Sequence, residues 1–209
     1  MMKRFILAVA ALAVFGIVGC GLFDREWVEL DEMVMPTLME ADEPTPVELE
    51  EPTLVEEAEE YGELIFATSF DEGYDGVEAL GAVIERASVY MRSGDYAMMV
   101  AARSETWHGM ALDVTDLAAP GGSYMYSLWV KNPGHWRTGF QLAIIIDGET
   151  SIMYGEYAAI TLNPGQWTRL VGFFEMPTGG ETVKLAVQTR EDAHQVFFVD
   201  DLSLYAIPR

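Results

Sequence analysis

The sequence predicts an all-β domain over residues 64–209, a jelly-roll β-sandwich of antiparallel strands. Short runs of β-branched and aromatic residues recur along this region, and turn-forming residues separate them. The run 124–131 alternates between two sets of bulky side chains, as in a sheet that is buried on one side and shields a groove on the other. Nine or ten such runs in one domain favour a jelly roll over a propeller or an up-and-down barrel.

The expected strands follow one another at 64–69, 88–91, 96–102, 109–114, 124–130, 140–147, 152–162, 168–175, 183–189 and 196–205. Each is rich in residues that fit a pleated surface. Turn residues between them occur at 93–95, 120–122, 132–134, 147–148, 163–165 and 178–180. Only residues 75–83 have a briefly helical pattern.

Charge and cysteine content exclude several classes of function. The 209 residues include 34 Asp and Glu against 12 Lys and Arg, which gives a net charge of −22. An acidic chain without a basic stripe repels phosphate backbones, so no nucleic-acid partner is expected. The lone cysteine, Cys20, excludes an internal disulfide framework and a cysteine-rich zinc site.

Residues 1–19 have the pattern of a lipoprotein signal peptide. Lys3 and Arg4 precede an apolar run at 5–18, which is too short to span a bilayer. The run ends in Ile-Val-Gly before Cys20, which resembles a bacterial lipidation motif. We expect Cys20 to be lipidated and to anchor the protein in the outer membrane or at the cell surface. The alternative is an ordinary signal peptide with an incidental cysteine.

Residues 20–63 are expected to form a disordered, acidic, proline-containing linker. Residues 24–63 contain 16 acidic residues and one base, and four prolines interrupt residues 21–62. Prolines prevent a continuous helix, and like charges extend a chain. We interpret this segment as a spacer between the membrane and the domain, and its apolar residues leave open a docking peptide for a partner.

Six short motifs then follow one another through the domain, at 68–73, 92–98, 106–115, 122–131, 164–170 and 197–204. In this order they resemble a carbohydrate-binding module of the type found in families 4, 9 and 22, a galactose-binding-like jelly roll. Such modules attach glycoside hydrolases to xylan and β-glucans. The resemblance implies binding of a polysaccharide without catalysis.

A sugar site needs an aromatic platform for the C–H faces of the rings and polar groups for the hydroxyls. The resemblance places Trp107 at the position of the ligand-stacking tryptophan; the alternative is a core tryptophan. It places Tyr154 and Tyr157 on a strand whose counterpart carries a stacking tyrosine. Trp129 and Trp167 match packing positions at strand centres.

Other positions differ from the family pattern or are ambiguous. Ala186 replaces an aromatic residue of the relatives, whereas Gln188 and Arg190 are placed to hydrogen-bond hydroxyls. This departure weakens the case for xylan as the ligand. Trp136 lies in a predicted loop, either as a second platform or as a loop anchor.

The resemblance also implies a structural calcium ion, bound by carboxylate and carbonyl oxygens between the first and last strands. Asp71 or Glu72, carbonyl groups around Arg92, and Asp201 match the ligand positions. The alternative is a set of solvated acids that cap a turn.

The chain carries no nucleophile elbow, zinc-protease motif, P-loop or dinucleotide fingerprint, so we expect no enzyme. The predicted function is that of a monomeric surface lipoprotein that binds polysaccharide or cell-wall glycan. The alternative is a structural or protein-interaction lipoprotein of the envelope, with the same fold and a degenerate sugar groove.

Overall fold

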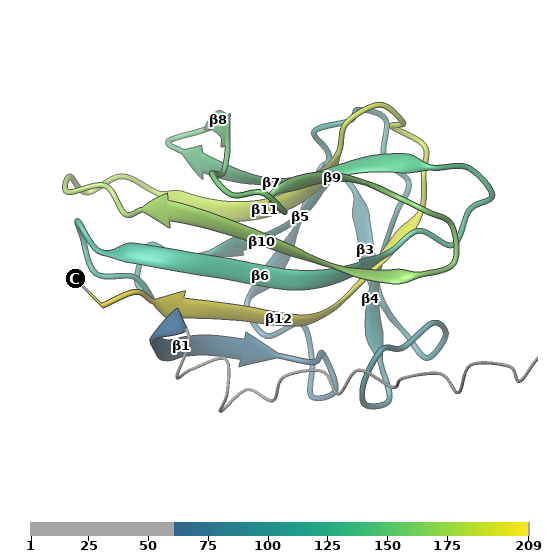
Figure 1. The fold of residues 1–209 in the computed structure, drawn as a ribbon, viewed down its shortest axis with the longest axis horizontal. Helices are drawn as coiled ribbons and strands as arrows, with labels where there is room; N and C mark the ends of the chain where they lie inside the picture. The colour runs from purple at the N-terminus through teal and green to yellow at the C-terminus, as the bar shows by residue number, and fades with distance from the viewer. Residues whose placement is uncertain (1–60, 209) are drawn as a thin grey trace, which may run out of the picture. The chain divides into compact units, whose positions relative to one another are not determined.

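The computed structural model describes residues 61–208, and it confirms the predicted β-sandwich. Two six-stranded antiparallel sheets pack face to face (Figure 1). Sheet A has the order β10-β6-β12-β4-β3, with β1 beside β12, and sheet B has the order β2-β5-β11-β7-β8, with β9 beside β7. The strands are β1 (Glu63–Thr68), β2 (Val77–Leu80), β3 (Val83–Ala87), β4 (Ala97–Ala101), β5 (Gly109–Asp113), β6 (Ser123–Lys131), β7 (Thr138–Ile146), β8 (Glu149–Ile152), β9 (Ala159–Leu162), β10 (Trp167–Glu175), β11 (Val183–Thr189) and β12 (Phe197–Ala206).

The hydrophobic core lies between the two sheets, where alternate residues of each strand point inward. In β6 these residues are Tyr124, Tyr126, Leu128 and Val130, all buried. Burial raises the pKa of the Tyr126 phenol, whose hydroxyl has no hydrogen-bond partner among the described residues. The alternation expected from the sequence is therefore the pleat of a strand with one face in the core.

The last strand, β12, pairs with three other strands of sheet A. In its C-terminal half β12 pairs with β1, and in its N-terminal half it pairs with β4, while β6 flanks it along its other edge (Figure 1). The register of β12 against β6 shifts between Asp200 and Ser203, and Asp201 has a positive φ of 44°. This irregularity turns the Asp200–Asp201 pair toward the β3–β4 loop, as β-bulges commonly do.

The structure corrects three expected elements. Residues 75–83 are not helical: Gly76 and Gly81 have positive φ and bracket the short strand β2. The strand expected at 88–91 lies instead at β3, and 88–91 is an exposed loop. The strand expected at 152–162 is two strands, because the chain leaves sheet B after Ile152 to pair with β10 through Tyr154.

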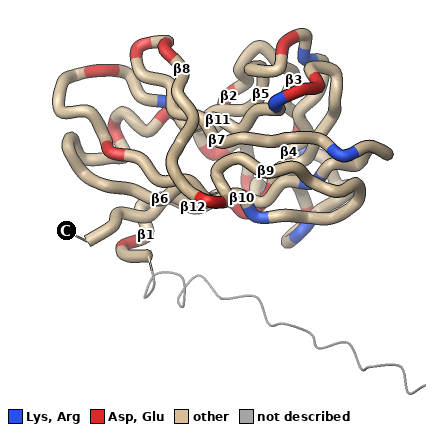
Figure 2. The backbone as a smooth tube through the Cα atoms, turned by 45° about the horizontal axis from the view of Figure 1, so that its top comes forward, with Lys and Arg blue, Asp and Glu red and all other residues tan. Residues whose placement is uncertain are grey.

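The predicted signal peptide, Cys20 and most of the predicted linker lie outside the described residues. Within residues 61–208, no helix has the length and apolarity needed to cross a membrane. Figure 2 shows the basic residues of this part scattered singly, without a continuous basic stripe.

Candidate functional site

The outer face of sheet B has a floor of small side chains. Met110, Leu112, Leu142 and Leu185 point into the core, so their neighbours in the strands point outward. Ala111, Ala186 and Ala143 lie side by side on three adjacent strands of this face and are fully buried. They form a second, small apolar cluster with Ile145, and the partly buried Leu80 packs against it.

A pair of amide side chains lies next to this alanine row. Gln188 of β11 is opposite Gln141 of β7, and Gln141 Nε2 donates to Gln188 Oε1 over 3.4 Å. Gln188 is only 1% exposed, and its Nε2 has no hydrogen-bond partner among the described residues. A buried amide with N–H groups that lack an acceptor is energetically costly, so this position is an unusual one on the face.

Trp107 lies at the edge of this face, in the loop between β4 and β5. Its side chain is 53% exposed, and its ring packs edge-on against His108 with centroids 4.2 Å apart. His108 in turn lies against Gly81, where an added Cβ would come within 2.3 Å of the imidazole. Gly109, two residues after Trp107, faces Gln188 across the β5–β11 pair. The structure therefore brings Trp107 and Gln188 to one corner of sheet B.

Arg103 fixes the loop that carries Trp107, and we did not identify it from the sequence. The residue is 4% exposed, and its guanidinium donates to the carbonyls of His108, Asp192 and Gln195 and to Thr189 Oγ1. Burial lowers the pKa of Arg103 from its ordinary value. Because one planar group binds three segments, the Trp107 loop is anchored to the end of β11 and to the following loop.

On the outer face of sheet B, away from Trp107, an ion pair lies across three strands. Lys184 of β11 pairs with Glu78 of β2 across the intervening strand β5, over the position of Ala111. The hydrogen bond from Lys184 to Glu78 raises the pKa of Lys184, and the charge of Asp113 acts in the same direction. The pair shields the alanine floor on that side.

The structure separates the two predicted tyrosines and carries Tyr154 away from this corner. Tyr154 is 80% exposed and exchanges both main-chain hydrogen bonds with Phe173 of β10, so its side chain shares a face with Phe173. Both line a cavity of about 500 Å³ at the end of the sandwich where β6 begins and β7 ends. Tyr157 is 54% exposed and lies nearer the amide pair, because Ala158 accepts from Leu142 and Ala159 is opposite Gln141 in the β7–β9 pair.

Arg190 and Trp136 lie beyond the amide pair. Arg190 is exposed, and its main-chain N–H donates to Gly139 of β7 over 2.8 Å. Trp136 is 82% exposed on the β6–β7 loop. This exposure favours the prediction of a second platform over that of a loop anchor.

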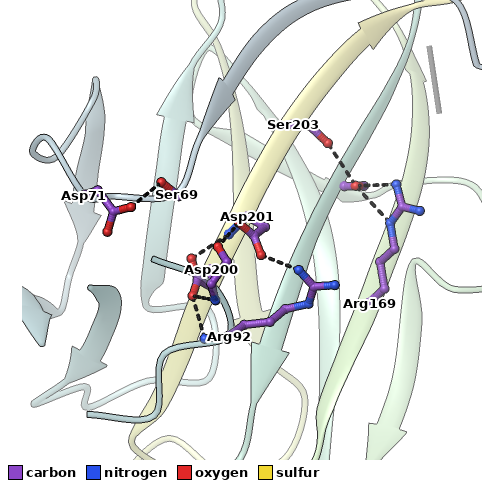
Figure 3. Close-up of polar contacts among 9 residues, drawn as sticks. Ser69, Asp71, Arg92, Arg169, Asp200, Asp201 and Ser203 are labelled. Carbon is purple, nitrogen blue, oxygen red and sulfur yellow. Dashed lines mark hydrogen bonds and ion pairs between the residues drawn. The ribbon is translucent and has the colours of Figure 1, made fainter. Parts of the chain in front are cut away.

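The residues predicted to bind calcium hold protein donors instead. Asp71 Oδ1 accepts the N–H groups of Asp95 and Tyr96, and these contacts, with Asp95 first, lower the pKa of Asp71. Asp201 accepts from Arg92 Nη1 at 2.5 Å and from Ser93 Oγ at 2.6 Å. Figure 3 shows Asp71 apart from the Asp201–Arg92 pair.

The neighbouring Asp200 is fully buried. Its Oδ2 accepts the N–H groups of Arg92 and Ser93, and its Oδ1 accepts that of Asp201. Burial raises the pKa of Asp200 to about 6, against the opposing effect of the Arg92 N–H group.

In this arrangement, N–H and guanidinium groups of the protein already occupy the Asp71 and Asp201 carboxylates. Glu72 is exposed, and the part of the chain that the structure describes has no group of three His, Cys, Asp or Glu side chains that could hold a metal. The Arg92 guanidinium lies on the Asp201 carboxylate, where the resemblance placed the cation. Calcium stays a prediction from the family resemblance alone.

Sequence reasoning missed the residues that support the site. Asn132 and Gln195 are polar residues in loops, and their roles depend on partners 63 positions apart. The Asn-Pro-Gly sequence at 132–134 did indicate a turn, but not a buried Asn132 that holds it. Gln141 lies in a run that we interpreted only as a strand.

Comparisons with known proteins agree with this fold. Residues 62–194 match the model of a family described as "Carbohydrate binding domain". The chain is 27% identical over 150 residues to the endo-1,4-beta-xylanase A of Thermoanaerobacterium saccharolyticum. The match covers 68% of this chain and 13% of that enzyme, so the chain spans about an eighth of its length.

Solved structures show the same sandwich. The CBM22-1 xylan-binding domain of Paenibacillus barcinonensis Xyn10C superposes with a TM-score of 0.63 at 20% identity, over 71% of this chain and 97% of that domain. The CBM22-1–GH10 modules of Clostridium thermocellum Xyn10B, complexed with xylohexaose, superpose with a TM-score of 0.61 at 21% identity, over 70% of this chain and 29% of that one. At this level of identity, the likeness shows a shared fold.

Proposed function

The chain belongs to the carbohydrate binding domain family, and from this membership we propose that its β-sandwich binds a β-linked polysaccharide of the xylan or β-glucan type without cleaving it. The observation that carries the proposal is the corner formed by Trp107 and Gln188. A half-exposed indole lies on an anchored loop two residues before Gly109, and Gly109 is opposite Gln188, whose buried Nε2 has no hydrogen-bond partner among the described residues. The structural relatives that are xylan-binding domains support this class of ligand.

The chemistry of the corner suits a weak, reversible ligand. Stacking of one sugar ring on Trp107 contributes about 1 kcal/mol. Hydrogen bonds from Gln188 and Arg190 add a net contribution of about 1 kcal/mol each. Loss of motion on binding offsets part of this gain, so we expect Kd values from about micromolar to millimolar.

The composition of the strands next to Trp107 supports a proposal of binding without cleavage. A glycosidase needs two carboxyl groups that face each other across the scissile bond. The strand positions next to Trp107 instead carry Gln188, Gln141 and the alanine floor. The acidic Glu78 is already paired with Lys184.

We further propose that the protein is an envelope lipoprotein anchored through Cys20. The basic start, the apolar run and the Ile-Val-Gly-Cys sequence support this localisation. Because each buried methylene adds about 0.8 kcal/mol, several acyl chains hold a protein firmly at a membrane. Many weak glycan sites on one membrane would then act together.

A second candidate function is a structural or protein-binding role in the envelope. Ala186 supports it, because a small, fully buried residue stands where the resemblance expected an aromatic platform. The Lys184–Glu78 pair across the outer face also supports it. In this case the groove would no longer bind sugars.

A glycan array followed by affinity gel electrophoresis tests the two candidates. We expect wild type to bind xylan or mixed-linkage glucan, and Trp107→Ala to abolish retardation in gels while melting stays nearly unchanged. Tyr74→Ala is a matched control, because Tyr74 is 46% exposed and precedes β2 at the far end of the sandwich. A wild type that binds no glycan on the array would favour the structural role.

A further inference from the structure

The most exposed large hydrophobic side chain in the described part of the chain is Trp136. Its exposed fraction is 82%, whereas Trp107 is 53% exposed. An exposed indole leaves a large apolar surface in contact with water, and such residues commonly mark contact sites. In a family of carbohydrate binding domains, an exposed indole is also the side chain best suited to stack on a sugar ring.

The loop that carries Trp136 is built around one buried side chain. Asn132 is fully buried, and its Nδ2 donates to the Trp136 carbonyl at 2.7 Å and to Thr138 Oγ1 at 3.2 Å. Its Oδ1 accepts the Gly134 N–H at 3.0 Å and Gln195 Nε2 at 2.9 Å. Asn132 thus makes four hydrogen bonds, two from each end of its amide. The backbone beneath Trp136 is therefore fixed before any ligand binds.

The same contacts join this loop to the one that carries Trp107. The main-chain carbonyl of Gln195 accepts from Arg103 Nη2 at 2.7 Å and from Arg103 Nε at 3.2 Å. The side chain of Gln195 donates to Asn132. Arg103 binds the carbonyl of His108, next to Trp107. Trp107 and Trp136 are consequently presented from two loops at one end of the sandwich, with the 190–196 loop between them.

A continuous path of polar groups connects the corner to Trp136. Gln141 and Gln188 face each other across β7 and β11, and one step further along the same strands Arg190 lies beside Gly139. The Glu191 carboxylate lies over Gly139: it accepts the Gly139 N–H at 3.1 Å, and an added Cβ at Gly139 would come within 2.7 Å of its Oε2. From Gln141 to Trp136 the chain spans at most about 17 Å, at 3.3 Å per residue. An extended polysaccharide can follow this direction off the end of sheet B.

We propose that Trp136 is a second aromatic platform for an extended β-linked polysaccharide. The ligand stacks on Trp107 beside Gln188, passes Arg190, and places a more distant sugar ring on Trp136. This inference rests on the proposed function and adds to it a requirement for chain length. Short oligosaccharides occupy the Trp107 corner alone, and longer chains gain the second contact without a second loss of overall motion.

Isothermal titration calorimetry with xylo-oligosaccharides and β-gluco-oligosaccharides of increasing length tests the proposal on the full chain. We expect wild-type affinity to rise with length up to a plateau. Trp136→Ala lowers affinity for the longest oligosaccharides about fivefold and leaves affinity for the shortest ones unchanged. Trp136→Phe keeps most of the length dependence, because it retains an aromatic face. Tyr74→Ala serves as the control for loss of an exposed ring elsewhere, and melting curves check folding of every variant.

The outcomes separate this inference from the proposed function. If Trp136→Ala binds long chains as wild type does, while Trp107→Ala loses binding, the second platform is overturned and glycan binding stands. If Trp136→Ala weakens short and long oligosaccharides equally, the extended path is wrong. If the wild type binds no oligosaccharide or polysaccharide at all, the proposed function fails and this inference fails with it.

Discussion

The guanidinium of Arg92 lies 3.8 Å from the centroid of the Trp129 ring, while its Nη1 donates to Asp201. One arginine thus stacks on the middle of β6 and pairs with the bulge of β12, and it ties the β3–β4 loop to the outer face of sheet A. The loop backbone adds two N–H donors to Asp200 (Figure 3). Protein groups thus join the β3–β4 loop to β12, where the resemblance predicted a calcium ion.

Calcium should have little effect on stability. Because Arg92 supplies the positive charge at Asp201, we expect the melting temperature to be the same in excess EGTA and in excess calcium. Arg92→Met, which keeps the stem and removes the charge, should lower the free energy of unfolding by about 2 kcal/mol. A bound ion would instead stabilise the fold by about 2.7 kcal/mol at a hundredfold excess over its Kd. A clear rise in melting temperature with calcium would restore the predicted site.

Asp200 should make stability depend on pH between about 4 and 6. Its pKa is raised to about 6 in the folded state, so the folded state holds a proton that the unfolded state has already lost in this interval. The contribution is fully present below pH 4 and is lost as the pH rises to about 6. The expected loss, about 3 kcal/mol for two pKa units, is visible as a difference between wild type and Asp200→Asn in urea unfolding at several pH values. A constant difference across this interval would contradict the assignment.

Arg103→Lys should impair both stability and binding. A lysine keeps the charge but cannot reach the carbonyls of His108, Asp192 and Gln195 from one planar group. Buried acceptors left unsatisfied cost about 1–3 kcal/mol each, so we expect the free energy of unfolding to fall by several kcal/mol. Thermal melting and affinity gels measure the two effects. Arg137→Lys, on the β6–β7 loop, is a matched control for the exchange of an exposed arginine. Unchanged melting of Arg103→Lys would show that the network is dispensable.

Metabolic labelling with a fatty-acid probe checks the proposed membrane anchor. We expect the wild type to be labelled and Cys20→Ser to be unlabelled, because the chain has no other cysteine to carry the acyl groups. A size shift on the gel, from cleavage before residue 20, should disappear together with the label. Equal labelling of the two proteins would mean that the motif is incidental.

Much of the sandwich could be predicted from sequence because its signals are local. The alternation in β6 depends only on neighbouring residues, and the Pro-Gly and Asp-Gly turns end strands where they occur. The same local reading failed at 75–83, where Gly76 and Gly81 adopt positive φ and the edge of sheet B forces a strand onto a helix-like pattern. Local patterns also failed to show that residues 152–162 belong to two strands, because Tyr154 leaves sheet B to pair with Phe173, which is distant in sequence.

The sequence by itself determined that this is an acidic all-β domain and that Trp107 is its best candidate for stacking on sugars. The tertiary structure decided which residues accompany Trp107: Gln188 joins it across the β5–β11 pair, whereas the pairing of Tyr154 with Phe173 carries that ring to the far end. The physical reason is that side-chain periodicity is encoded within a strand, whereas strand order and register depend on partners distant in sequence. Arg103 and Asn132 illustrate the same rule, since the groups that they hold come from loops brought together only by the folded sheets.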